Sequence, residues 1–112
     1  MVRRPSDAVL LSKELSDLLE GLEPDNKLRK WIEDMAVILK ENMFAGDRIR
    51  KRKIPASYVE RYGVNNLYRY AHPEGHRSCY TILNVEGLGL CPVILDIRTH
   101  AGYERVFGYR RG

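Results

Sequence analysis

The side chains best suited to chemistry lie between Asn65 and Arg111, where a run of three predicted strands is followed by His100, Tyr103 and Arg105. Cleavage of RNA requires that the 2′-hydroxyl loses a proton and that the attacking and leaving oxygens are held in line. It also requires that charge on the phosphorane-like transition state is stabilised and that the 5′-oxygen gains a proton. Arg suits the charge-stabilising task through its bidentate fork, and His titrates nearest neutrality. Such residues beside a basic sheet suit RNA phosphodiester chemistry better than small-molecule chemistry.

Signatures of other chemistries are missing from the sequence. It contains no P-loop, no GxGxxG after a strand, no HExxH, no GxSxG and no Cys/His metal spacing. Asp96 and His100 are four residues apart, but nothing supplies a third ligand. We therefore expect neither a metal nor a cofactor.

Each candidate also has a structural interpretation. Arg77 in the middle of a strand could form a salt bridge with Asp96, and His100 could be hydrogen-bonded within the fold. Tyr103 and Phe107 share one helical face, so core packing is at least as well supported as a chemical role. His72 and His76 flank an exposed turn and are expected to be bystanders. The basic run at residues 48–53 is either a solvated face or a contact for the RNA backbone.

The net charge of +4 conceals an asymmetry. Residues 1–45 carry 7 Lys/Arg against 9 Asp/Glu, which gives −2, and residues 46–112 carry 12 against 6, which gives +6. All seven tyrosines also lie in the second part. A basic, tyrosine-rich half beside an acidic helical half favours a nucleic-acid face on a supporting scaffold, although a basic solvated surface explains the same counts.

We expect one domain over residues 1–112, with a helical part at 6–45 and a sheet with the candidate site at 46–109. No signal peptide and no membrane-spanning run is recognisable, so a cytoplasmic location without a membrane partner is predicted. Cys79 and Cys91 are expected on neighbouring strands, where a bridge is geometrically conceivable but unusual in reduced cytosol.

Two helices are predicted at the N-terminus. The first runs from a cap at Ser6 or Asp7 to about Glu20, and the second runs from a cap at Asp25 to Gly46. Trp31 and Met35 are predicted to be core residues of the second helix. The short connection between the helices favours an antiparallel hairpin.

Alternating apolar positions and turn signals predict the sheet. Pro55 and Gly63 bound a short helix, His72-Pro73-Glu74-Gly75 predicts a turn that sets Tyr70 opposite Ser78, and a helical tail runs from Thr99 to Phe107. The predicted strands are residues 47–54, 67–71, 76–83 and 91–97. The expected fold class is α+β: an N-terminal antiparallel helical hairpin packed on a mainly antiparallel, roughly four-stranded curved sheet whose other face is partly open.

Three motifs carry a family resemblance. The order HPEG-HR-x-x-YTI, a VILDI strand and H-x-x-Y-E-R-x-F-G-Y resembles the RelE/ParE toxin superfamily, particularly its archaeal RelE-like branch. The upstream stretch KRKIPASYVERYGVNNLYRY is similar to that branch as well. The resemblance covers residues 46–109 closely, and residues 6–45 only in the arrangement of two helices.

The resemblance implies an endoribonuclease that cuts mRNA in the ribosomal A site and is blocked by a small antitoxin protein. It implies that Arg77 stabilises the transition state and that His100, or alternatively Tyr103, is the general acid. Lys51 and Lys53 are candidates to aid the base, and Glu60 has no clear counterpart. The RNA-binding residues implied are Arg50, Lys51, Arg52, Lys53, Arg69, Arg98 and Arg105.

The sequence leaves four hypotheses open. The favoured one is the ribosome-dependent endoribonuclease. The others are a non-catalytic RNA- or ribosome-binding member of the fold, a ParE-like gyrase inhibitor, and an unrelated small α/β protein.

Overall fold

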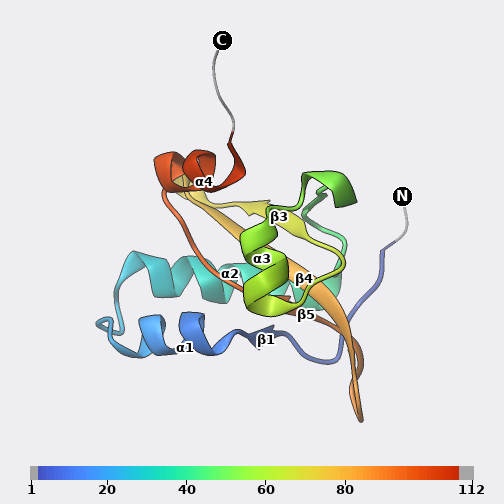
Figure 1. The fold of residues 1–112 in the computed structure, drawn as a ribbon. Helices are drawn as coiled ribbons and strands as arrows, with labels where there is room; N and C mark the ends of the chain where they lie inside the picture. Colours follow the sequence, from blue (N-terminus) through green and yellow to red (C-terminus); the bar gives the residue numbers. More distant parts are fainter. Residues whose placement is uncertain (1–2, 109–112) are drawn as a thin grey trace.

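The computed structural model describes residues 3–108 as a central sheet with helices on both sides (Figure 1). The helices are α1 (Lys13–Glu20), α2 (Lys27–Glu41), α3 (Ala56–Tyr62) and α4 (His100–Phe107), with short 3₁₀ turns η1 (Lys51–Lys53) and η2 (Pro73–Gly75). The strands are β1 (Leu10–Leu11), β2 (Asp47–Arg48), β3 (Tyr68–Ala71), β4 (Arg77–Val85) and β5 (Gly89–Ile94). No helix among residues 3–108 is long and apolar enough to cross a membrane.

The five strands form one mixed sheet in the order β1-β5-β4-β3-β2. Strand β1 runs parallel to β5, with Leu10 beside Val93 and Leu11 beside Ile94, and the other pairs are antiparallel. The hairpin register was predicted correctly, since Tyr70 lies opposite Ser78. That register follows from the turn, where Glu74 and Gly75 both adopt the left-handed conformation.

The predicted fold class is wrong. The sheet has five strands and is mixed, and its four helices are not an N-terminal hairpin on a four-stranded antiparallel sheet. The first helix begins at Lys13 because Ser12 caps it: the Ser12 hydroxyl accepts from the Leu15 amide (3.1 Å) and donates to the Leu95 carbonyl (2.7 Å). The preceding residues therefore leave the helix and pair with β5.

The basic strand predicted at residues 47–54 is also wrong. Only Asp47 and Arg48 pair with β3, and the chain then turns through η1. Consecutive cationic side chains repel one another and leave this segment few apolar side chains to pack on the sheet, so it curls outward into solvent. Its side chains at positions 50–53 are exposed.

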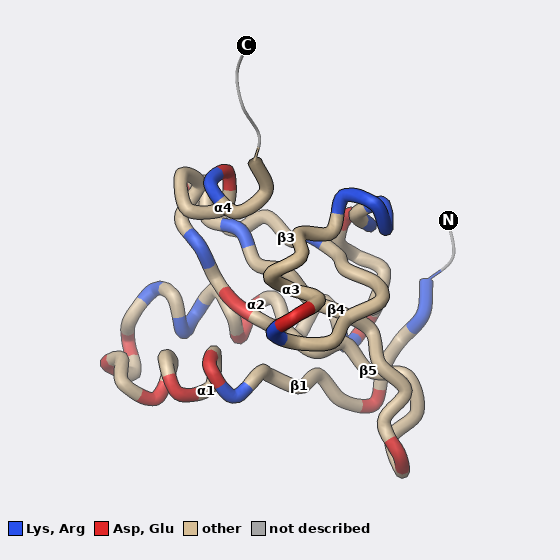
Figure 2. Tube along the Cα trace, viewed as in Figure 1, with Lys and Arg blue, Asp and Glu red and all other residues tan. Residues whose placement is uncertain are grey.

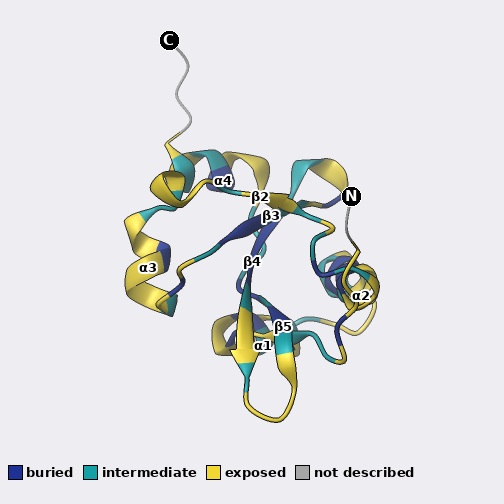
Figure 3. Ribbon diagram, turned by 90° about the vertical axis from the view of Figure 1, so that its right-hand side faces the viewer, coloured by how far each residue is buried: buried dark blue, intermediate teal, exposed yellow. Residues whose placement is uncertain are grey.

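Each face of the sheet carries its own apolar core. One core joins Leu15, Ile32, Met35 and Leu39 of α1 and α2 to the stacked rings of Tyr68 and Tyr80 (5.1 Å between centroids). The other joins Tyr58 of α3 and Tyr103 of α4 to Cys79 and Leu95. Figure 3 shows α2 on one side of the sheet and α3 and α4 on the other, so the second face, expected to be partly open, is covered.

Two smaller predictions concern buried side chains. Trp31 and Met35 are core residues as predicted, with 9% and 0% of their surface exposed. Cys79 and Cys91 are both buried free thiols, and they lie beside Arg69 and Leu83 respectively rather than beside each other. The two thiols are separated along the sheet and do not form a disulfide.

Candidate functional site

Arg77 and Arg98 face each other at the end of the sheet. Each backbone amide donates to the carbonyl of the other at 2.8 Å, which makes them a hydrogen-bonded antiparallel pair beyond the end of β5. Two like charges placed directly opposite each other destabilise a sheet. A negatively charged group, from the protein or from a ligand, would therefore stabilise this pair of arginines.

Asp96 compensates only one of the two arginines. Its carboxylate accepts from Arg98 Nε (3.1 Å), from the Cys79 amide (3.0 Å) and, through a short hydrogen bond, from the Tyr58 hydroxyl. Arg98 also donates to the Tyr58 hydroxyl at 3.3 Å. Burial raises the pKa of Tyr58, so its hydroxyl remains a donor.

Within residues 3–108, the Arg77 guanidinium bonds only to backbone. Its Nη1 donates to the carbonyls of Gly75 (3.0 Å) and His76 (3.2 Å), and among residues 3–108 no carboxylate lies within ion-pair distance. The salt bridge considered between Arg77 and Asp96 is thus formed by Arg98 instead. Arg77 is held in position while its positive charge is left uncompensated.

His100 lies against the same turn. It is the first residue of α4, whose cap Thr99 accepts from the Gly102 amide at 3.0 Å. A Cβ placed on Gly75 would lie 3.3 Å from His100 Cβ, so the histidine packs directly on this glycine. The imidazole Nε2 pairs with Glu104 at 3.1 Å, and 57% of the side chain is exposed. The structure therefore brings His100 and Arg77 together around Gly75.

Tyr103 occupies a different environment from His100. Only 3% of its surface is exposed, and its ring stacks on Phe107 with centroids 4.3 Å apart. The guanidinium of Arg69 donates to Asp47 Oδ2 at 3.2 Å. Burial lowers the pKa of Arg69, but its interactions with Asp47 and Tyr103 outweigh burial and raise that pKa. Tyr103 therefore supports an arginine of the same sheet face from within the second core.

The remaining basic side chains lie beside this face. Arg48, Arg50, Lys53 and Arg69, with Asp47, line a cavity of about 220 Å³. Lys51, Arg52 and Arg105 are exposed. Figure 2 shows the lysines and arginines of the segment after β2 as one block, whereas acidic residues are spread along α1.

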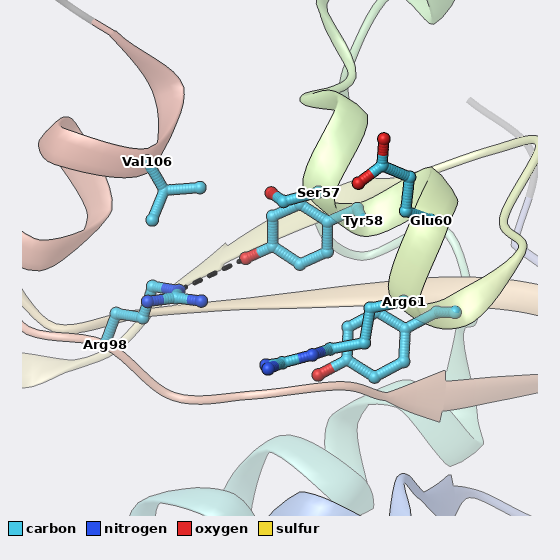
Figure 4. A pocket seen from close by; sticks show the side chains of 7 residues that line it. Ser57, Tyr58, Glu60, Arg61, Arg98 and Val106 are labelled. Carbon is cyan, nitrogen blue, oxygen red and sulfur yellow. Dashed lines mark hydrogen bonds between the residues drawn. The ribbon is translucent and has the colours of Figure 1, made fainter.

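A pocket of about 520 Å³ between α3 and α4 was not predicted from the sequence. It is lined by Ser57, Tyr58, Glu60, Arg61, Tyr62, Arg98 and Val106, and Figure 4 shows the Arg61 and Arg98 side chains extending toward each other. A helix of seven residues with two tyrosines and one arginine carries no recognised motif. Only the packing of α3 over the end of the sheet creates the pocket.

His72 is buried rather than exposed on a turn. Its Nε2 lies 2.8 Å from the hydroxyl of Ser78, and its ring stacks with Trp31 at 6.2 Å between centroids. Burial, assisted by the charges of His76 and Arg77, lowers the pKa of His72 to about 4. With 0% of Ser78 exposed, the His72–Ser78 pair is a core contact and not a nucleophile with its base.

The described residues hold no cluster of three or more His, Cys, Asp or Glu side chains that could bind a metal. No protein-family model, curated protein or solved structure matches this chain. The resemblance to the RelE/ParE superfamily therefore rests on the motifs quoted above.

Proposed function

We propose that this protein is an RNA endonuclease that cleaves by attack of the 2′-hydroxyl on the adjacent phosphate. The observation that carries the proposal is the meeting of Arg77 and His100 at Gly75. Arg77 supplies a guanidinium that has no carboxylate partner among residues 3–108. His100 supplies a largely exposed imidazole whose Nε2 pairs with Glu104. These are the groups that charge stabilisation and proton transfer require.

The roles follow from these positions. The 2′-oxygen forms a bond to phosphorus while the bond from phosphorus to the 5′-oxygen breaks. Arg77 stabilises the added negative charge on the equatorial oxygens, and His100 delivers a proton to the departing 5′-oxygen. A base accepts the proton of the 2′-hydroxyl, and the family resemblance suggests Lys51 and Lys53 as candidates for this role. The products are a 2′,3′-cyclic phosphate and a 5′-hydroxyl.

The substrate class is supported by the charges around the site. Arg50, Lys51, Arg52, Lys53 and Arg105 are exposed cations, and Arg69 and Arg98 share the sheet face with Arg77. Such a group contacts phosphates along a strand without reading its sequence. Action on mRNA in the ribosomal A site is added by the sequence resemblance alone, as in a toxin of a toxin–antitoxin system.

The same proposal includes a small antitoxin protein as partner. Exposed apolar side chains on α1 and α2, namely Leu18, Val37 and Ile38, offer such a partner an apolar surface. An amphipathic helix is the element that fits exposed side chains of this kind.

The test is cleavage of mRNA on programmed ribosomes by the wild type, Arg77→Ala, His100→Ala and the control Lys40→Ala. Lys40 is an exposed cation on α2, so its loss removes the same charge from a remote helix. We expect Arg77→Ala and His100→Ala to slow cleavage by about 10²-fold or more while Lys40→Ala cuts at the wild-type rate.

Folding of each variant is checked by circular dichroism. Undiminished cleavage by folded Arg77→Ala would contradict the assigned mechanism. A folded wild type that binds ribosomes but leaves the mRNA intact would contradict catalysis and support the non-catalytic hypothesis.

A further inference from the structure

The pocket between α3 and α4 is large enough for a small organic ligand. Its volume of about 520 Å³ lies within the range of roughly 300–1,000 Å³ that such ligands occupy. It adjoins the proposed catalytic site, because Arg98, which lines it, is the backbone partner of Arg77. A ligand bound in the pocket would therefore lie next to Arg77, the proposed catalytic arginine.

The charges in the pocket favour an anion. Arg61 and Arg98 line both this pocket and a second cavity of about 180 Å³, so these two residues lie at the boundary of the two. Asp96 neutralises Arg98. Among residues 3–108 no carboxylate, including the nearby Glu60, lies within ion-pair distance of Arg61. Arg61 therefore has no carboxylate partner among these residues and lines the pocket together with Arg98.

Polar donors converge on the same space. The Tyr58 hydroxyl lies 3.3 Å from Arg98 Nε, and Figure 4 shows the Arg61 guanidinium extending below it from the opposite side. Two guanidinium groups whose side chains extend toward each other match the several acceptor oxygens of a phosphate group.

The remaining walls suit a flat ring. The rings of Tyr58 and Tyr62 lie 5.9 Å apart, and Val106 contributes an apolar side chain from α4. Nucleobases stack on tyrosine rings regardless of base identity, and each stacked base contributes about 1–3 kcal/mol of binding. A phosphate position next to a tyrosine wall is the pattern expected for a nucleotide.

We propose that this pocket binds one nucleotide of the RNA next to the cleaved one, with its phosphate at Arg61 and Arg98 and its base against Tyr62. The assignment to RNA rests on the proposed function. The nucleotide held here fixes the strand so that the neighbouring phosphate lies at Arg77. Arg61 is thus a substrate-positioning residue and takes no part in proton transfer.

The first experiment titrates the intact protein with three probes: inorganic phosphate, a nucleoside and the matching 5′-nucleoside monophosphate. The monophosphate is expected to bind at least tenfold more tightly than either of the other two, because it engages the arginines and the tyrosine wall together. Equal affinity for phosphate and monophosphate would overturn the proposal, since the base would then make no contact.

Variants locate the binding. Arg61→Ala is expected to weaken monophosphate binding tenfold or more, and Arg61→Lys to restore it partly. Arg4→Ala, which removes an exposed arginine near the N-terminus, is expected to leave the affinity unchanged. Arg61 is itself exposed, so its substitution leaves the core intact. Unchanged affinity in Arg61→Ala would contradict the assignment.

A kinetic comparison separates this inference from the proposed function. In the cleavage assay Arg61→Ala is expected to raise KM with little change in kcat, whereas Arg77→Ala lowers kcat and keeps monophosphate binding. An unchanged KM in Arg61→Ala would refute nucleotide binding in this pocket but would leave the proposed nuclease activity standing. Monophosphate binding that depends on Arg61 in a protein that never cleaves RNA would refute the nuclease and retain the pocket as a nucleotide site.

Discussion

At the scale of single residues, Asp96 determines which of the two opposed arginines, Arg77 or Arg98, has a carboxylate partner. Its carboxylate joins α3 through Tyr58, β4 through the Cys79 amide and the end of the sheet through Arg98. Burial lowers the pKa of Arg98, but its hydrogen bonds to Tyr58 and Asp96 outweigh this and keep the guanidinium charged. Because one carboxylate satisfies Arg98, the arginine opposite it retains its charge for substrate.

His72 is a second residue whose environment has a measurable consequence. Its folded-state pKa of about 4 lies below the ordinary value of 6.5, because burial and then the charges of His76 and Arg77 disfavour the protonated ring. The unfolded chain therefore binds a proton on His72 before the folded protein does. Stability from this group is present above pH 6.5 and is lost as the pH falls toward 4.

We predict that the free energy of unfolding falls by about 1–2 kcal/mol more in the wild type than in His72→Gln between pH 7 and pH 4.5. This range is smaller than the pKa difference alone implies, since solvent at the edge of the ring screens part of the effect. Urea denaturation followed by the fluorescence of Trp31 measures it. Equal losses in the two proteins would show that His72 is not held neutral.

At the scale of elements, the segment after α2 is set by a close approach and not by a helix stop. The helix ends at Glu41, and Gly46, predicted to end it, lies four residues beyond the cap Asn42. The Gly46 amide donates to the hydroxyl of Tyr80 (2.9 Å), which donates to the Met43 carbonyl (2.8 Å). These two hydrogen bonds of the Tyr80 hydroxyl hold the chain against the sheet just before β2.

We predict that Gly46→Ala destabilises the protein by about 1–3 kcal/mol. An added Cβ would lie 2.6 Å from the Arg69 carbonyl oxygen and 2.8 Å from the ring of Tyr80, which is fully buried and cannot move away cheaply.

The matched control for this substitution is Gly21→Ala. There the nearest atom is 3.6 Å away and the backbone is in the right-handed helical region, so the change is expected to be neutral or stabilising by up to about 1 kcal/mol. Chemical denaturation of both variants compares them. Similar stabilities would mean that the backbone around Gly46 relaxes freely.

At the scale of the whole molecule, the two faces of the sheet are covered by helices from different segments of the chain and differ in charge. The N-terminal segment contributes α1 and α2 to one face of the sheet, and the basic segment places α3, α4, Arg69, Arg77 and Arg98 on the other. A polyanion is therefore attracted more strongly to the second face.

We predict that RNA binding weakens steeply with salt. About four phosphate contacts would give a slope near −3 in log K against log salt concentration, at about 0.7 per contact for a single strand. Lys51→Ala is expected to reduce the slope by about 0.7. The control Lys40→Ala on α2 is expected to leave it unchanged, and fluorescence anisotropy at several salt concentrations measures all three. A slope near zero would rule out backbone recognition.

The sequence by itself determined the features that depend on neighbouring residues. The turn at residues 72–75 set the register that pairs Tyr70 with Ser78, and the tail formed the predicted helix α4, which ends at Gly108. Gly63 ended the short helix after Pro55 as predicted. Turns and helix ends follow from local backbone preferences, which a single sequence expresses directly.

The tertiary structure alone decided what depends on contacts between distant segments. Leu10 and Leu11 fit the apolar spacing of a helix, yet they pair with Val93 and Ile94, more than eighty residues away. The same kind of contact placed Tyr58 on Asp96, His100 on Gly75 and α3 over the end of the sheet. Periodicity shows which side chains must be buried but not against which partner, because burial is favourable wherever complementary surfaces meet.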